Sequence, residues 1–155
     1  MSNEMISKNV FLGGSKCIGR LPDKVVTLID ELMEKREHFI IGDCHGMDLA
    51  FQTYLESKHY PHVTIYCSGE KCRFNVGDWP EKHICVPDGI EGYKFYRVKD
   101  YALMKDCDAA LLVYETRALA TRSYIYYLKR LGKPIFAFDL ERDRFKIIDK
   151  REVTE

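Results

Sequence analysis

The sequence predicts an α/β fold of three layers, with a Rossmann-like, mostly parallel sheet and helices on both of its faces. Short apolar runs alternate with helical patterns almost throughout the chain, and the connections between them are short. Several of these runs are apolar at every position, which is typical of strands buried on both faces. The chain has 155 residues, of which 46% are hydrophobic and 31% are charged, and this profile fits one folded domain spanning residues 1–155.

The first half of the chain contains three predicted strands and two predicted helices. Val10 to Leu12 is a buried strand, and the two glycines that follow it are predicted to form a turn. Pro22 suits the first turn of a helix, where its missing N–H costs nothing, and apolar residues then recur every three or four positions up to Met33. The remaining elements of this half are a strand at residues 39–42, a helix beginning near Leu49, and a strand at residues 63–66.

The second half begins with a long polar loop, residues 67–83, which contains the only tryptophan, Trp79. A Pro-Asp-Gly sequence at residues 87–89 predicts a turn after a short strand, and Gly132-Lys133-Pro134 predicts the end of a helix. The strand at residues 109–113 is the most hydrophobic, and we expect it at the centre of the sheet. The other predicted elements are strands at residues 84–86, 135–138 and 145–148, the last at an edge, and helices at residues 93–105 and 119–131.

Charge and composition argue against several classes of function. The 24 lysines and arginines balance the 24 aspartates and glutamates, so the protein has no broad positive field with which to hold nucleic acid or an anionic membrane. No apolar run approaches membrane-spanning length, and residues 1–8 contain no apolar signal segment, so we expect a cytoplasmic protein.

The six cysteines contain no Cys-x-x-Cys pair, so zinc-type spacing is absent and we expect neither a metal site nor a cofactor. In a reducing compartment we expect free thiols, several of them buried. Cys67 and Cys72 are the pair that stands out, because they bracket the start of the long loop.

In open parallel sheets, ligands bind beyond the carboxyl ends of the strands, near the point where the strand order reverses. The segments after the first three strands and after the strand at residues 109–113 should therefore share one rim. Glycines, hydroxyls, cations and carboxylates gather in these segments. The candidate ligand-binding residues are Gly13, Gly14, Ser15, Lys16, Asp43, Gly46, Asp48, Ser68, Gly69, Arg73, Asn75, Thr121, Arg122 and Ser123.

Each of these candidates has an alternative explanation that involves no ligand. The two glycines could form a tight turn and nothing more. Asp48 could cap the second helix instead of holding a ribose, and Arg73 and Lys16 could be solvated surface charges. His45 fits a loop residue better than a catalytic base, since the sequence shows no partner for it. The argument therefore depends on the candidates lying together.

The chain resembles the SLOG superfamily of Rossmann-like proteins in two motifs, Val10-Phe11-Leu12-Gly13-Gly14-Ser15-Lys16 and Gly42-Asp43-Cys44-His45-Gly46-Met47-Asp48. That superfamily includes DNA-processing protein A and the lonely-guy phosphoribohydrolases, and the layout is also similar to nucleoside 2-deoxyribosyltransferase-like folds. The segment at residues 67–79 looks like the mark of an uncharacterised single-domain branch. The resemblance implies a nucleotide site in which Gly13, Gly14 and Ser15 line the phosphate or ribose and Gly46 and Asp48 complete the adjacent turn.

The chain also departs from this pattern. The phosphoribohydrolases carry a Pro-Gly-Gly-x-Gly-Thr-x-x-Glu motif, whereas the corresponding place here reads Leu119-Ala120-Thr121-Arg122-Ser123-Tyr124, without a glycine or a carboxylate. Thr121, Arg122 and Ser123 at the start of a helix still suit a phosphate, through hydroxyls, a guanidinium and backbone N–H groups. Glycosidic hydrolysis by the familiar residues of that family is therefore in doubt.

The first functional hypothesis is a protein that senses or sequesters a small nucleotide, either a nucleoside phosphate or an ADP-ribose-type signal. Its phosphate would lie near Ser15, Lys16 and Arg122, and Asp43 or Asp48 would accept hydrogen bonds from the ribose. We expect the small nucleotide as partner, with no nucleic acid and no membrane. A homodimer or higher homo-oligomer could form through the helix at residues 119–131, which carries three tyrosines, Tyr124, Tyr126 and Tyr127.

The second hypothesis is an N-glycosidase or a nucleoside 2-deoxyribosyltransferase-like enzyme. Breaking a nucleoside C–N bond develops positive charge on the sugar, so a carboxylate is needed near the anomeric carbon. Glu115, at the end of the strand at residues 109–113, is the first candidate for a catalytic role, and Asp43 is the second. The alternative for Glu115 is a surface ion pair with Arg117 or Arg122.

Overall fold

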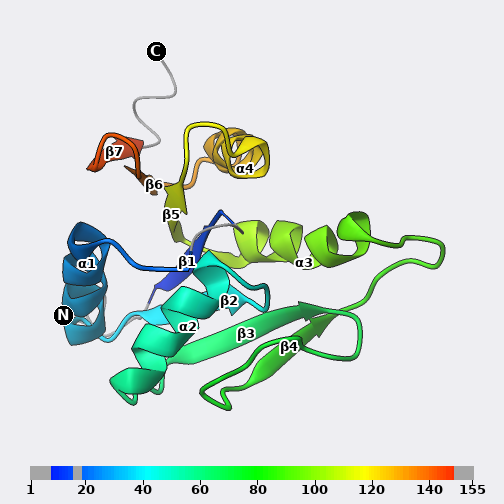
Figure 1. The fold of residues 1–155 in the computed structure, drawn as a ribbon. Helices are drawn as coiled ribbons and strands as arrows, with labels where there is room; N and C mark the ends of the chain where they lie inside the picture. Colours follow the sequence, from blue (N-terminus) through cyan, green and yellow to red (C-terminus); the bar gives the residue numbers. More distant parts are fainter. Residues whose placement is uncertain (1–7, 16–18, 149–155) are drawn as a thin grey trace.

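The computed structural model describes residues 8–15 and 19–148 and contains one sheet covered by helices on both faces (Figure 1). In this part of the chain seven strands pair in the order β4-β3-β2-β1-β5-β6-β7, and every pair is parallel except the antiparallel pair of β6 and β7. The predicted α/β, Rossmann-like class is confirmed. The strands are β1 (Asn9–Gly14), β2 (His38–Gly42), β3 (Val63–Ser68), β4 (Glu81–Ile84), β5 (Ala109–Tyr114), β6 (Ile135–Asp139) and β7 (Arg144–Ile148).

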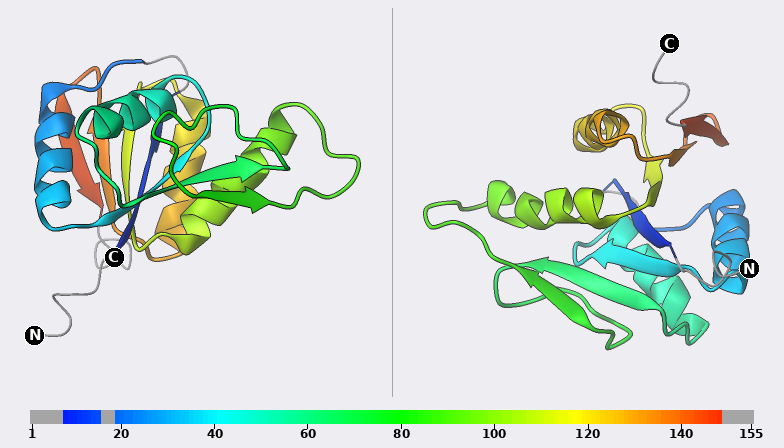
Figure 2. Two further views of the ribbon diagram at one scale, coloured as in Figure 1. Left: turned by 90° about the horizontal axis from the view of Figure 1, so that it is seen from below. Right: turned by 180° about the vertical axis from the view of Figure 1, so that it is seen from behind.

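Helices lie on both faces of the sheet (Figure 2). An apolar core lies between the sheet and the helices on each face. Helices α1 (Asp23–Glu34) and α2 (Met47–Ser57) cover one face, and α3 (Tyr93–Asp106) and α4 (Leu119–Arg130) cover the other. Successive side chains of a strand point to opposite faces, so Val10 and Leu12 belong to the first core whereas Phe11 belongs to the second. None of the helices in the described ranges is long and apolar enough to span a membrane.

The strand order reverses between β1 and β5. The chain builds the sheet outward from β1 through β2 and β3 to β4, then returns through α3 to place β5 on the other side of β1. The middle strand of the seven is thus β1, and the strand predicted to be central, β5, is its neighbour. The carboxyl ends of these parallel strands lie at one rim, as the sequence predicted.

Gly13 and Gly14 differ from the prediction because they continue β1 instead of forming a turn. Gly14 pairs with Val113 of β5, and a Cβ atom on Gly14 would lie only 2.1 Å from the Val113 carbonyl oxygen. The glycine is therefore required by the close approach of two strands, and neither glycine has the positive φ of a left-handed turn.

Strand β4 begins three residues before the predicted position and is reached without a helix. Residues 69–80, here called the crossover segment, return the chain to the start of β4, which then runs parallel to β3. Trp79, 7% exposed, fills the first core beneath this segment, and its Nε1–H donates a 2.8 Å hydrogen bond to the Tyr60 carbonyl. The tryptophan thus packs this part of the sheet face.

The expectation of free thiols is wrong for one pair of cysteines. Cys67 at the end of β3 and Cys72 in the crossover segment form a disulfide, which ties the first residues of this segment to the sheet. The two cysteines are five positions apart in the sequence, so the bond closes only a small loop.

Candidate functional site

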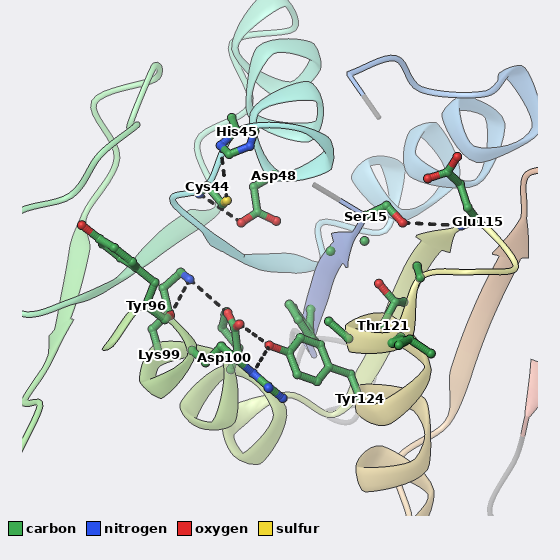
Figure 3. A pocket seen from close by; sticks show the side chains of 18 of the residues that line it. Ser15, Cys44, His45, Asp48, Tyr96, Lys99, Asp100, Glu115, Thr121 and Tyr124 are labelled. Atoms are coloured by element: carbon green, nitrogen blue, oxygen red, sulfur yellow. Dashed lines mark hydrogen bonds and ion pairs between the residues drawn. The ribbon is translucent and has the colours of Figure 1, made fainter. Parts of the chain in front are cut away.

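A cavity of about 620 Å³ opens at the carboxyl ends of β1 and β5. Figure 3 shows that side chains reach it from the segments that follow β1, β2 and β5 and from helices α2, α3 and α4. Its volume is in the range of sites for small molecules, and its position is the one that the reversal of strand order favours. The cavity (Figure 3) is the candidate binding site.

Ser15 lines the cavity, but its backbone N–H and carbonyl groups already make hydrogen bonds within the protein. Its N–H donates to the Val113 carbonyl at 3.1 Å, and its carbonyl accepts the Met47 N–H at 3.2 Å. The Ser15 hydroxyl oxygen accepts the Glu115 N–H at 3.5 Å, and the residue is 6% exposed. Ser15 can therefore offer its hydroxyl to a ligand, whereas its backbone N–H is engaged within the sheet.

Lys99, on α3, places a buried ammonium group in the wall. The residue is 3% exposed, and its Nζ donates to the Tyr96 carbonyl at 2.8 Å and to Asp100 Oδ1 at 3.1 Å. Burial alone lowers the pKa of an amine, but the charges of Asp100, Asp48 and Asp43 outweigh it and raise the pKa of Lys99. The ammonium is thus charged at neutral pH.

Asp48 lies at the second residue of α2, and its carboxylate points into the cavity (Figure 3). Oδ2 accepts the Cys44 N–H at 3.1 Å, so the side chain binds the turn before the helix while Gly46 takes the N-cap position. Burial raises the pKa of Asp48 to about 7, with Asp100 and Asp43 adding to the increase and Lys99 opposing it. The carboxyl group therefore exchanges its proton near neutral pH.

Asp43 lies behind the cavity wall and holds Arg73. The carboxylate is almost fully buried, and it accepts the backbone N–H of Arg73 at 2.8 Å and the guanidinium at 2.9 Å. The same guanidinium stacks on the Tyr96 ring, 3.8 Å from its centroid. Asp43 thus positions a cation of the wall, and both of its oxygens are engaged, which speaks against the predicted roles as a ribose ligand or a catalytic group.

A chain of polar groups joins α3 to α4 across the cavity (Figure 3). The Tyr124 hydroxyl donates a hydrogen bond to Asp100, and Arg97 Nε donates to the Tyr124 oxygen at 3.3 Å. Burial and the charge of Asp100 raise the pKa of Tyr124, so the phenol stays protonated. Tyr124 therefore faces the interior, while Tyr126 and Leu119 are exposed and the expected oligomer stays a prediction.

The amino terminus of α4 opens into the cavity. Residues 117–121 all line it, and this 12-residue helix has no side-chain cap, no acidic residue in its first turn and two basic residues in its last. The first N–H groups of a helix and its dipole favour an anion, and Arg117 adds a guanidinium at the same place. Arg122 and Ser123 are exposed and do not line the cavity, so the part of the α4 terminus that lines it lies earlier in the chain than predicted.

The structure brings about half of the predicted site residues to the cavity. Those that line it are Gly13, Gly14, Ser15, Asp48, Arg73, Glu115 and Thr121. Those that lie elsewhere are Asp43, Gly46, Ser68, Gly69, Asn75, Arg122 and Ser123. Lys16 falls outside the described residues.

Several wall residues were missed because they lie within helices and not after strands. They include Tyr96, Arg97, Lys99, Asp100 and Tyr124. Arg117, in contrast, follows β5 in the turn before α4, and the sequence suggested it only as an ion-pair partner of Glu115. Within α3, Tyr96, Lys99 and Asp100 recur at helical spacing, and this polar and aromatic stripe is the signal that could have found them. Comparison with models of protein families, with characterised proteins and with solved structures finds no significant match.

Proposed function

We propose that the cavity binds a small nucleotide, of the nucleoside phosphate or ADP-ribose type, and that the protein senses or sequesters this ligand. The observation that carries the proposal is the chemistry of the groups that line the cavity. The amino terminus of α4 and Arg117 suit a phosphate. Asp48 and the Asp100–Tyr124 pair offer carboxylate and hydroxyl oxygens to which ribose hydroxyls can donate.

Aromatic and charged groups in the wall suit the rest of such a ligand. The Tyr96 ring is held by Arg73 on one side, which gives a rigid surface near the polar groups. The cations of the wall are balanced by carboxylates, since Lys99 pairs with Asp100 and Arg73 with Asp43. A ligand with a single phosphate and several hydroxyls fits this balance better than a nucleic acid, whose repeated phosphates need many unpaired cations.

Thermal unfolding with a panel of ligands tests the proposal. We expect nucleoside monophosphates and ADP-ribose to raise Tm, and the corresponding nucleosides without phosphate to raise it less, because they leave the α4 terminus unused. Arg117→Ala should weaken binding by about tenfold or more, as expected for a lost charge-assisted contact. Arg122→Ala is the matched control, since Arg122 is a nearby arginine in the first turn of α4, exposed and away from the cavity.

Two results would contradict the proposal. One is a panel in which no phosphate-bearing nucleotide changes Tm. The other is equal affinity in the wild type and Arg117→Ala with loss of affinity in Arg122→Ala, since this would move the phosphate to the outer side of α4.

One observation favours a second candidate, the N-glycosidase. Asp48 has a pKa of about 7, which suits a group that donates a proton to a departing base, and Glu115 lines the same cavity. In such a reaction the C–N bond breaks, the base takes the proton of Asp48, and water adds its hydroxyl to the anomeric carbon and returns a proton. Chromatography of nucleotides incubated with the protein should then detect free base that Asp48→Asn and Glu115→Gln abolish; ligand stabilisation without base release supports the binding protein.

A further inference from the structure

Four potential metal ligands lie together at the end of β3, away from the cavity: Cys67, Cys72, Glu81 and His83. Their ligand atoms are all within 4.8 Å of one another. We propose that, once the Cys67–Cys72 disulfide is reduced, these four side chains bind one zinc-type divalent cation. The site combines two thiolates, one imidazole and one carboxylate, which are the ligand types that Zn²⁺ takes in proteins.

The register of the two parallel edge strands brings these ligands together. Cys67 of β3 is paired with His83 of β4, and Ile65 is paired with Glu81, so Glu81 and His83 are two residues apart and project from the same face of β4. Cys72 comes back to this face from the crossover segment. The sequence spacing is C-x4-C-x8-E-x-H, which is not a zinc signature, so the site becomes visible only through the fold.

The hydrogen bonds of His83 leave one ring nitrogen for a cation. Nδ1 lies 2.8 Å from the Gly69 carbonyl oxygen, which can only accept, so Nδ1 carries a hydrogen. Nε2 lies 2.9 Å from Glu81 Oε1. If His83 is neutral with its hydrogen on Nδ1, then Nε2 and the Glu81 oxygen are both acceptors. Two acceptors lie this close only when a proton or a cation sits between them. A histidine whose other N–H is held by a backbone carbonyl is the usual arrangement in metal sites.

Glu81, like His83, is oriented by a hydrogen bond to a neighbouring group. Its second carboxylate oxygen, Oε2, accepts the Asn75 amide at 2.9 Å, and the Asn75 side chain is fixed by two hydrogen bonds to the backbone of Trp79. The carboxylate is therefore oriented by an amide that is itself oriented, which leaves Oε1 facing His83. Partners of this kind keep a ligand in place before the metal arrives.

The distances suit a tetrahedral ion. Zinc lies about 2.3 Å from sulfur and about 2.0 to 2.2 Å from nitrogen or oxygen, so the ligand atoms of a tetrahedral site lie about 3.3 to 3.8 Å apart. This is within the 4.8 Å spread of the four atoms. Cys67 is fixed in β3, whereas Cys72 is on a loop and can move to the required distance.

Disulfide and metal are alternative states, because a sulfur in a disulfide has no thiolate to offer. A phosphine reductant opens the bond: the phosphine is oxidised to its oxide with oxygen from water, and the two sulfurs take up two electrons and two protons. Zinc then displaces the two thiol protons and keeps its own oxidation state. The two states can therefore be prepared and compared in the same chain.

The test is cobalt and zinc binding to the full chain, reduced with a phosphine and desalted without oxygen. We expect one Co²⁺ per reduced chain, with the visible bands of tetrahedral cobalt–thiolate coordination, displaced by Zn²⁺, and no such bands for the oxidised chain. Cys72→Ser and His83→Ala should each weaken binding at least about a hundredfold. The matched control is Cys85→Ser, since Cys85 is an exposed thiol two residues beyond His83 that takes no part in the cluster.

A second measurement needs no variant. In the reduced wild type, zinc should slow alkylation of Cys67 and Cys72 and leave that of exposed Cys85 unchanged, as read by mass spectrometry of peptides. The proposal is overturned if zinc protects neither Cys67 nor Cys72, if the oxidised chain shows the same cobalt bands, or if Cys85→Ser loses the metal while His83→Ala retains it.

Discussion

Replacing Asp48 by asparagine should stabilise the protein, and more so at high pH. Asparagine mimics the protonated carboxyl group and keeps an oxygen that can accept the Cys44 N–H. The folded chain binds the Asp48 proton more tightly than the unfolded chain, because burial raises the pKa from 3.8 to about 7. This proton therefore contributes its whole stabilisation below pH 3.8, and the contribution is lost as pH rises to about 7. At pH 8 the charged carboxylate lowers the free energy of unfolding.

The size of this effect follows from the shift. A change from 3.8 to about 7 is roughly three pKa units. At 1.36 kcal/mol per unit, ionisation of Asp48 destabilises the folded state, relative to a side chain that stays neutral, by about 4 kcal/mol at pH 8 and about 1.5 kcal/mol at pH 5. Both are upper figures, because water entering the cavity screens the carboxylate. The gap between Asp48→Asn and the wild type should thus widen by about 1 to 2.5 kcal/mol between pH 5 and pH 8.

Urea unfolding of both proteins at pH 5 and pH 8 measures this gap. Asp88→Asn is the matched control, since Asp88 is exposed on a turn and the same chemical change there should stay within about 0.5 kcal/mol at both pH values. The raised pKa of Asp48 is refuted if Asp48→Asn is less stable than the wild type at pH 8, or if the difference in stability does not grow with pH.

Two further changes test the packing. Gly14→Ala should lower the free energy of unfolding by about 3 kcal/mol or more, because its Cβ would lie 2.1 Å from the Val113 carbonyl oxygen; Gly19→Ala, with nothing within 4 Å, should change it by less than about 0.5 kcal/mol. Trp79→Phe should cost about 2 kcal/mol, because the buried Tyr60 carbonyl loses its 2.8 Å partner. Circular dichroism in urea follows all three, and a Gly14→Ala protein as stable as wild type, or an unchanged Trp79→Phe, would contradict the packing described.

The sequence predicted best the strands that are apolar at consecutive positions. The runs of β1, β2, β3 and β5 are typical of strands covered on both faces of a parallel sheet, so the bounds of these strands were predicted to within two residues. β4 was misplaced because Glu81, Lys82 and His83 carry no apolar pattern. An edge strand is held mainly by backbone pairing with its neighbour, and such pairing leaves little trace in the side chains.

The candidate site was only half predictable for a related reason. The rule that ligands bind at strand ends found Ser15, Asp48 and Glu115. It could not find Lys99, because a lysine in a helix usually faces water. Its burial is tolerable only because the carboxylates of Asp48 and Asp43, from other segments, join that of the adjacent Asp100. Nor could it find Tyr124, whose partner Asp100 lies 24 residues away on another helix.

The position of β1 affects how the chain is made. Among the described elements β1 is made before the others, yet one of its two neighbours is β5, which is synthesised only after strands β2, β3 and β4 and helices α1, α2 and α3. Until then one edge of an apolar strand lacks its partner, and the Ser15 N–H lacks the Val113 carbonyl. An open edge of this kind invites pairing with another chain. Fragments that end before Tyr114 should therefore aggregate, and a fusion partner or circular permutation intended to aid production should keep β1 and β5 in the same chain.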